Sequence, residues 1–151
     1  MACMRVDIVD QRLAVEGGWQ RRAWIVEDEP AAASLAADLC AASGAAPSVF
    51  RLPLPFLTAL RMSPAPAVVV LDWRLENQLS AALFMATRHR YPRLPIIYWT
   101  GSLTAALPSM IQDDQFTIVV DKAAGSAPFE DALAWAFGEK QRPTLEGLTA
   151  V

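Results

Sequence analysis

The stretch "VVVLDWRLEN", residues 68–77, decides the fold of this chain. Four consecutive apolar residues, three of them β-branched, are followed at once by a carboxylate, Asp72, and the chain then turns polar. An apolar run without alternation is typical of a strand in a parallel sheet that helices cover on both faces. The stretch therefore predicts a buried central strand at 67–72 whose carboxyl end presents Asp72.

Short apolar runs and helix-forming segments alternate on both sides of this strand. Pro30 and Gly44 indicate the start and stop of a helix, on which Leu35 and Leu39 share one face. Ser80 is expected to cap a helix at 81–90. The remaining predicted elements are strands at 23–26, 48–52, 95–100 and 117–122, helices at 55–62 and 128–137, and a weak helix over 101–115 that Pro108 interrupts. Five alternating strand–helix units predict an α/β protein with a doubly wound parallel sheet and right-handed crossovers.

Length and composition indicate one globular domain. The 151 residues are 54% hydrophobic and 19% charged, with a net charge of −3. Because no cluster of Lys and Arg is present to neutralise phosphates, no nucleic-acid-binding face is expected. The apolar runs are too short to cross a membrane, no signal peptide is evident, and Cys3 and Cys40 are expected to be free thiols. We expect a cytoplasmic protein with an N-terminal extension at 1–20, a domain at 21–138 and a C-terminal tail at 139–151.

Polar groups stand at the carboxyl ends of four predicted strands: Glu27, Asp28 and Glu29 after the first, Asp72 after the third, Thr100 and Gly101 after the fourth, and Asp121 and Lys122 after the fifth. In a doubly wound sheet the ligand crevice lies beyond these ends, at the point where the strand order reverses. Crowded carboxylates repel one another, and this repulsion raises the pKa of at least one of them. A hard divalent cation removes that problem, and Mg²⁺ also bridges readily to phosphate.

This set of residue types predicts a phosphoryl site. Asp72 is the expected nucleophile, attacking phosphorus in line to form an aspartyl phosphate. Asp28 and Asp72 are expected to hold Mg²⁺, which offsets charge on the transferred group. Lys122 and Thr100 supply an ammonium and a hydroxyl for phosphate oxygens, while Gly101 leaves room for the phosphoryl group to enter.

On four motifs, "IVEDEP", "VVVLDWRL", "PIIYWTG" and "VVDK", the chain resembles the receiver domains of two-component response regulators, over roughly residues 21–138. The resemblance implies a flavodoxin-like (βα)5 fold with a five-stranded parallel sheet. By the same resemblance the site residues have these roles: Glu27 and Asp28 the acidic pair that binds metal with Asp72, Asp72 also the phosphoacceptor, Thr100 the switch hydroxyl, Lys122 the family's lysine, and the backbone carbonyl of Arg74 a further metal ligand. The implied function is to accept a phosphoryl group, with Mg²⁺, from a sensor histidine kinase or a histidine phosphotransfer protein.

The last predicted helix is the expected partner surface. Phe129, Leu133 and Phe137 follow helical spacing and should face the sheet, which places Trp135 on roughly the opposite side. In receiver domains this helix, the last strand and the fourth helix form the usual output and dimer face. Trp135 is therefore expected to contact a partner, and a homodimer through the last strand and helix is a further expectation.

The sequence departs from the receiver pattern at three places. Five residues separate Lys122 from Pro128, whereas receivers usually carry a proline directly after the lysine. Val119 stands where receivers often have an aromatic residue that moves with the hydroxyl. Glu76 stands where many have a proline. The set of site residues is complete, but the relay from the site to a partner surface is expected to differ.

Two other functions are open from the residues alone. One is a receiver-like interaction module that signals by partner binding without phosphorylation, which the longer loop and Val119 favour and the complete acidic set opposes. The other is a phosphohydrolase with an aspartyl-phosphate intermediate. Such enzymes commonly carry a second acid two residues after the nucleophile, but that place is Arg74, so a general acid is missing and no enzyme is expected. Asp72 as a mere helix cap is the structural alternative.

Overall fold

The computed structural model describes residues 21–75, 78–101 and 107–143. The predicted extension at 1–20 and the tail beyond 143 lie outside these residues. The elements are, in chain order, β1 (Arg21–Val26), α1 (Pro30–Ala42), β2 (Ala45–Phe50), α2 (Pro53–Met62), β3 (Val68–Leu71), β4 (Arg74–Leu75), β5 (Gln78–Leu79), α3 (Ala81–Arg90), β6 (Ile96–Thr100), α4 (Ser109–Gln112), β7 (Thr117–Asp121), the 3-10 helix η2 (Lys122–Ala124) and α5 (Ala127–Ala136).

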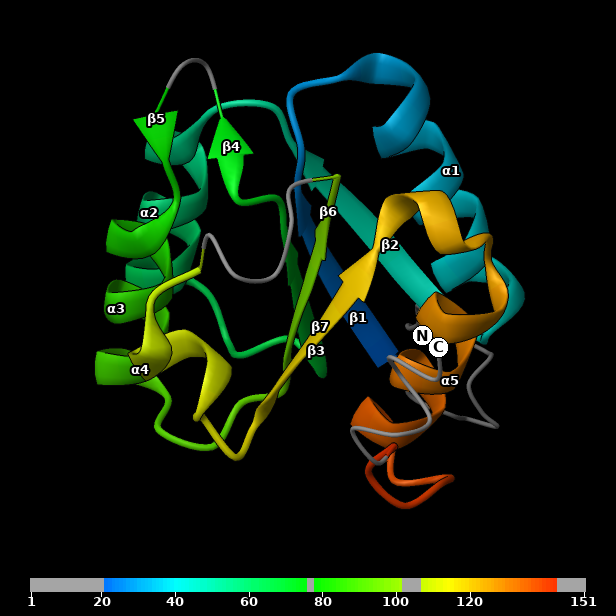
Figure 1. Cartoon of the computed structure of the whole chain (residues 1–151). Coiled ribbons are helices and arrows are strands. Elements are labelled where there is room, and N and C mark those ends of the chain that lie inside the picture. The colour runs from blue at the N-terminus through cyan, green and yellow to red at the C-terminus, as the bar shows by residue number, and fades with distance from the viewer. Residues whose placement is uncertain (1–20, 76–77, 102–106, 144–151) are drawn as a thin grey trace, which may run out of the picture.

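Five parallel strands form the central sheet in the order β2-β1-β3-β6-β7. This is the flavodoxin-like order, in which the chain moves to one edge after β1 and to the other after β3. Helices α1 and α5 cover one face, and α2, α3 and α4 cover the other (Figure 1). The predicted doubly wound α/β fold with a five-stranded parallel sheet is confirmed.

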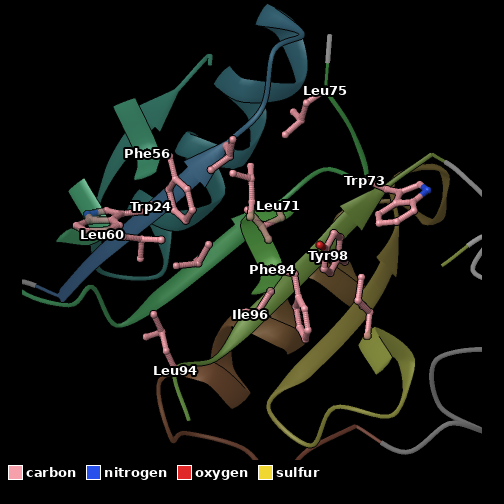
Figure 2. Close-up of a cluster of buried hydrophobic side chains, with 14 of the residues drawn as sticks. Trp24, Phe56, Leu60, Leu71, Trp73, Leu75, Phe84, Leu94, Ile96 and Tyr98 are labelled. Carbon is pink, nitrogen blue, oxygen red and sulfur yellow. The ribbon is translucent and has the colours of Figure 1, made fainter. Parts of the chain in front are cut away.

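A separate hydrophobic core lies on each face of the sheet. Val69 and Leu71 point into the core beneath α2 and α3, together with the aromatic rings shown in Figure 2. Val68 and Val70 point into the core beneath α1 and α5. Successive residues of a strand face opposite sides of the sheet, so a strand covered on both sides is apolar at every position. Residues 68–71, directly before Asp72, are all apolar because each of them enters one of the two cores.

The predicted bounds of the second strand are wrong. The second strand spans 45–50 and not 48–52, because Gly44, at φ 89°, ends α1 and turns the chain directly into β2. Helix α1 buries small residues, Ala33, Ala36 and Cys40, and leaves Leu35 47% exposed. Small side chains let a helix lie close to a sheet, and Leu39, which shares the face of Leu35, packs against the same core while partly buried.

Residues 74–79 contain structure that the sequence pattern did not indicate. Strands β4 and β5 pair antiparallel, with Arg74 opposite Leu79 and Leu75 opposite Gln78, so a small hairpin follows Asp72. The weak helix predicted at 101–115 is the single turn α4, which begins directly after Pro108; residues 102–106 are not among the described residues. None of the described helices is long and apolar enough to span a bilayer.

Candidate phosphoryl and metal site

The register of β1 and β3 places two carboxylates side by side at the carboxyl edge of the sheet. Val26 pairs with Leu71, so Glu27 and Asp72 are the next residues of adjacent parallel strands. The amide of Asp72 donates to the carbonyl of Val26 at 3.2 Å and holds this end of the strand in register. Glu27, Asp28 and Asp72 each offer a carboxylate oxygen, and these oxygens all lie within 4.8 Å of one another.

Lys122 enters this acidic cluster from the carboxyl end of β7. Its Nζ lies 2.8 Å from Oε1 of Glu27 and 3.2 Å from Oδ2 of Asp72. The ammonium also lies 5.2 Å from the centroid of the Trp99 ring, within the range of a cation–π interaction. One cation is thus shared by two carboxylates, as expected for a residue that screens charge at a phosphoryl site.

Burial and crowding shift the pKa values of this group. Burial is the largest influence on Glu27 and raises its pKa, and the charge of Asp72 raises it further, while bonds from Lys122 and the amide of Glu29 oppose the shift. Burial by itself lowers the pKa of Lys122, but Glu27 and Asp72 together bring it above its ordinary value. Lys122 is therefore an ammonium at neutral pH, and Glu27 is a carboxylate that ionises less readily than usual.

Glu27 makes stability fall as pH rises. Because its pKa in the folded state is above the ordinary value of 4.5, the folded chain binds the proton more tightly than the unfolded chain does. Its contribution to stability is therefore greatest below about pH 4.5 and declines as pH rises through the folded pKa. Relative to wild type, Glu27→Gln is expected to become more stable as pH rises from 4.5 to neutrality, measured by urea unfolding. If the free energy of unfolding changed with pH in the same way in both proteins, this prediction would be contradicted.

The chemistry of the donor set fits a hard divalent cation. Mg²⁺ prefers carboxylate oxygens, and three of them converge here from two strand ends. Glu27, Asp28 and Asp72 are the residues that would hold the ion, and Lys122 pairs with Glu27 and Asp72 among them. When bound, Mg²⁺ would offset negative charge on a phosphoryl group. Arg74 lies in β4 with an exposed side chain, and its backbone carbonyl as a further ligand stays a prediction.

Thr100 and Gly101 follow the same edge of the sheet. Thr100 is the last residue of β6, is buried, and pairs in register with Asp121 of β7. Apart from its chain neighbours, no described residue has a heavy atom within 4 Å of the place where a side chain of Gly101 would begin. Two other acids near these strand ends have local structural roles instead. Glu29 caps α1 through the amides of its first turn, and Asp121 caps η2 by accepting from Ala123 at 2.8 Å.

The sequence did not single out Trp99 as part of the site. The residue is buried, packs at 5.2 Å on the Phe129 ring and faces the ammonium of Lys122. Its position directly before Thr100 is the one feature of the sequence that places Trp99 near the site. Because Trp99 and Thr100 face opposite sides of the sheet, however, only the path of the lysine from β7 brings ring and ammonium together.

Trp135 does not stand free on the outer side of α5. It is half-buried, packs against the core beneath α1 and α5, and lies under the guanidinium of Arg142 at 5.6 Å. Arg142 also donates to the carbonyl oxygens of Gln115 and Thr117 at 2.9 and 2.7 Å. Phe129 and Leu133 face the sheet as predicted, while Phe137 is only partly buried. The start of the tail therefore contacts Trp135, and its role in contacting a partner stays a prediction.

Comparison with solved structures identifies the class of fold. No family model matches the chain, and no curated protein matches it. A response regulator receiver protein from Sinorhizobium medicae WSM419 superposes with a TM-score of 0.68 at 16% identity, over 79% of this chain and 95% of that one. The response regulator TrrA from Thermotoga maritima, in complex with Mg²⁺ and BeF, gives a TM-score of 0.66 at 16% identity, over 77% and 98%.

A third similar structure is the beryllofluoride-activated NtrC4 receiver domain dimer, with a TM-score of 0.68 at 18% identity, over 78% of this chain and 97% of that one. Receiver domains thus recur among the structural neighbours. The chain has the receiver domain fold, as the four sequence motifs led us to expect.

Proposed function

We propose that this chain is a response regulator receiver that accepts a phosphoryl group on Asp72. The observation that carries the proposal is the convergence of Glu27, Asp28, Asp72 and Lys122 at the carboxyl edge of a receiver-fold sheet. These residues come from three strand ends that are far apart in the sequence. A structural role for each residue alone, such as a helix cap, gives no reason for them to meet.

In the proposed reaction a carboxylate oxygen of Asp72 forms a bond to phosphorus while the bond from phosphorus to the donor breaks. With a phosphohistidine donor the leaving group is the imidazole nitrogen, which keeps the bonding electrons. Lys122 is already bonded to Oδ2 of Asp72 and would move its ammonium onto a phosphoryl oxygen. Thr100 would donate its hydroxyl to another of these oxygens. The proposed donors are a sensor histidine kinase or a histidine phosphotransfer protein.

Incubation with acetyl phosphate and Mg²⁺, followed by intact mass spectrometry, tests the proposal. Wild type is expected to gain the mass of one phosphoryl group, with acetate as the leaving group. Asp72→Asn should gain none, because an amide does not attack phosphorus. Asp28→Asn keeps the nucleophile but removes a cation ligand, so its gain should be slow and should respond weakly to added Mg²⁺. A mass gain in Asp72→Asn, or none in wild type, would contradict the proposal.

We also propose that the chain is a phosphoacceptor and not an enzyme with turnover. Arg74, an exposed residue of β4, stands two positions after Asp72, where a phosphohydrolase of this chemistry carries its general acid. Hydrolysis of a small phosphomonoester over many turnovers would contradict this. We further propose a homodimer through β7 and α5, where Arg142 packs on Trp135, and sedimentation of the phosphorylated chain tests whether it forms.

A further inference from the structure

A buried pair of hydroxyl groups joins the segment after Asp72 to the strand that carries Thr100. Ser80 and Tyr98 are 1% and 0% exposed. Oγ of Ser80 donates to the hydroxyl of Tyr98 at 3.2 Å, and that hydroxyl donates to the carbonyl oxygen of Ser80 at 3.4 Å. Each hydroxyl proton therefore has an acceptor inside the protein, as buried polar groups require.

Ser80 makes this pair in place of the role that its position in the sequence predicts. It is the N-cap residue of α3, as expected, but its side chain makes no capping hydrogen bond. A serine at an N-cap usually accepts from an amide of the first turn. The hydroxyl is directed to Tyr98 instead, so the pair takes precedence over the cap in the folded chain.

Trp73 connects the same pair to Asp72. It follows Asp72 directly, is 3% exposed, and packs edge-on against the Tyr98 ring with centroids 6.2 Å apart. Its carbonyl accepts from the amide of Ser80 at 2.9 Å. Figure 2 shows Trp73 and Phe84 beside Tyr98 in the same core. The hairpin of β4 and β5 lies between Trp73 and Ser80, so both of its ends are held by this cluster.

Helix α5 also connects to the site, through Trp99, whose ring packs on Phe129 and lies 5.2 Å from the ammonium of Lys122. Val119 pairs with Tyr98 in register but carries neither a ring nor a hydroxyl. The guanidinium of Arg142 lies 5.6 Å from the centroid of the Trp135 ring. The start of α3 adjoins a different set of groups: Tyr98 of β6, and Trp73, the residue after Asp72.

We infer that Trp73 and the Ser80–Tyr98 pair couple the state of Asp72 to the hairpin and the first turn of α3. The inference rests on the proposed function. A phosphoryl group on Asp72 adds charge and volume next to Trp73, and tightly packed interiors answer such changes by moving between discrete arrangements. A shift of Trp73 reaches Tyr98 through the ring contact and Ser80 through the backbone hydrogen bond. Ser80 and Tyr98 are positioning residues in this scheme.

Hydrogen–deuterium exchange of the full chain tests the coupling, with acetyl phosphate and Mg²⁺ as the probe and the mass gain recorded on the same samples. In wild type, phosphorylation is expected to change amide exchange in Trp73–Leu75 and Ser80–Phe84 by about tenfold, within the range typical of coupled sites. Tyr98→Phe should gain the same mass, yet its exchange should change by less than about twofold. Tyr91→Phe is the matched control, because its hydroxyl only approaches the carbonyl of Ser63 at 3.5 Å, and it should behave as wild type.

Ser80→Ala is the second variant, because it keeps the ring packing of Tyr98 and decides the matter if Tyr98→Phe folds poorly. It is also expected to gain the full mass with a reduced change in exchange. If both variants transmit the change as wild type does, or if the change in wild type is confined to residues 109–137, the inference is overturned while the proposed function stands. If wild type gains no mass, the proposed function fails and the inference fails with it.

Discussion

Replacing Lys122 by methionine is expected to destabilise the folded chain by about 3–5 kcal/mol at neutral pH. The substitution keeps a long apolar stem but removes the cation shared by Glu27 and Asp72, whose side chains are only 2% and 10% exposed. A buried carboxylate without a partner either stays charged at high cost or takes up a proton. Urea unfolding at several pH values measures both responses, and the variant should recover stability as pH falls.

Lys140→Met is the matched control for this prediction. Lys140 forms an ion pair with Asp131 at the same distance of 2.8 Å, but the two side chains are 58% and 52% exposed. Water screens such a pair, so its loss should cost less than about 1 kcal/mol. Equal losses in the two variants would show that the acidic cluster does not depend on Lys122 for charge balance.

Arg88→Met is expected to cost a similar amount, about 3–5 kcal/mol, at the opposite end of the sheet. The Arg88 guanidinium binds both carboxylate oxygens of Asp114, at 2.9 and 3.0 Å, and these side chains are 16% and 13% exposed. It also donates to three carbonyl oxygens, those of Tyr91, Leu94 and Phe116. Methionine fills much of the space but satisfies none of these acceptors, and each buried one left unpaired costs free energy.

Arg21→Met is the control for Arg88, measured by denaturant unfolding under the same conditions. Arg21 pairs with Glu139 at 2.6 Å, but both side chains are about half exposed, 41% and 52%. Its loss should cost less than about 1 kcal/mol. Phosphorylation of Arg88→Met by acetyl phosphate should persist wherever the variant is folded, because Arg88 lies at the far end of the strands. If Arg88→Met lowered the free energy of unfolding by no more than Arg21→Met does, the hydrogen bonds of Arg88 would not stabilise the fold.

The elements that could be predicted best are those whose pattern reports burial directly. The strand of Asp72 was expected at 67–72 and spans Val68–Leu71, and the helix at 81–90 has the predicted bounds. The second strand was misplaced because "SVF" is more apolar than "AAP", although both belong to an edge strand that is largely exposed. In α1 the leucines form a clear face, yet packing distance to the sheet selects the alanines and Cys40 for burial.

The sequence alone determined that carboxylates, a hydroxyl and an ammonium end four buried strands, because strand direction and parallel order bring carboxyl ends to one edge. It could not determine which of these groups meet. The tertiary structure decides these contacts through the distances between side chains on neighbouring elements. It places Lys122 between Glu27 and Asp72 and directs the Ser80 hydroxyl to Tyr98. It also leaves Glu29 as the cap of α1. Such contacts depend on distances between residues that are remote in the chain, and no local pattern encodes those distances.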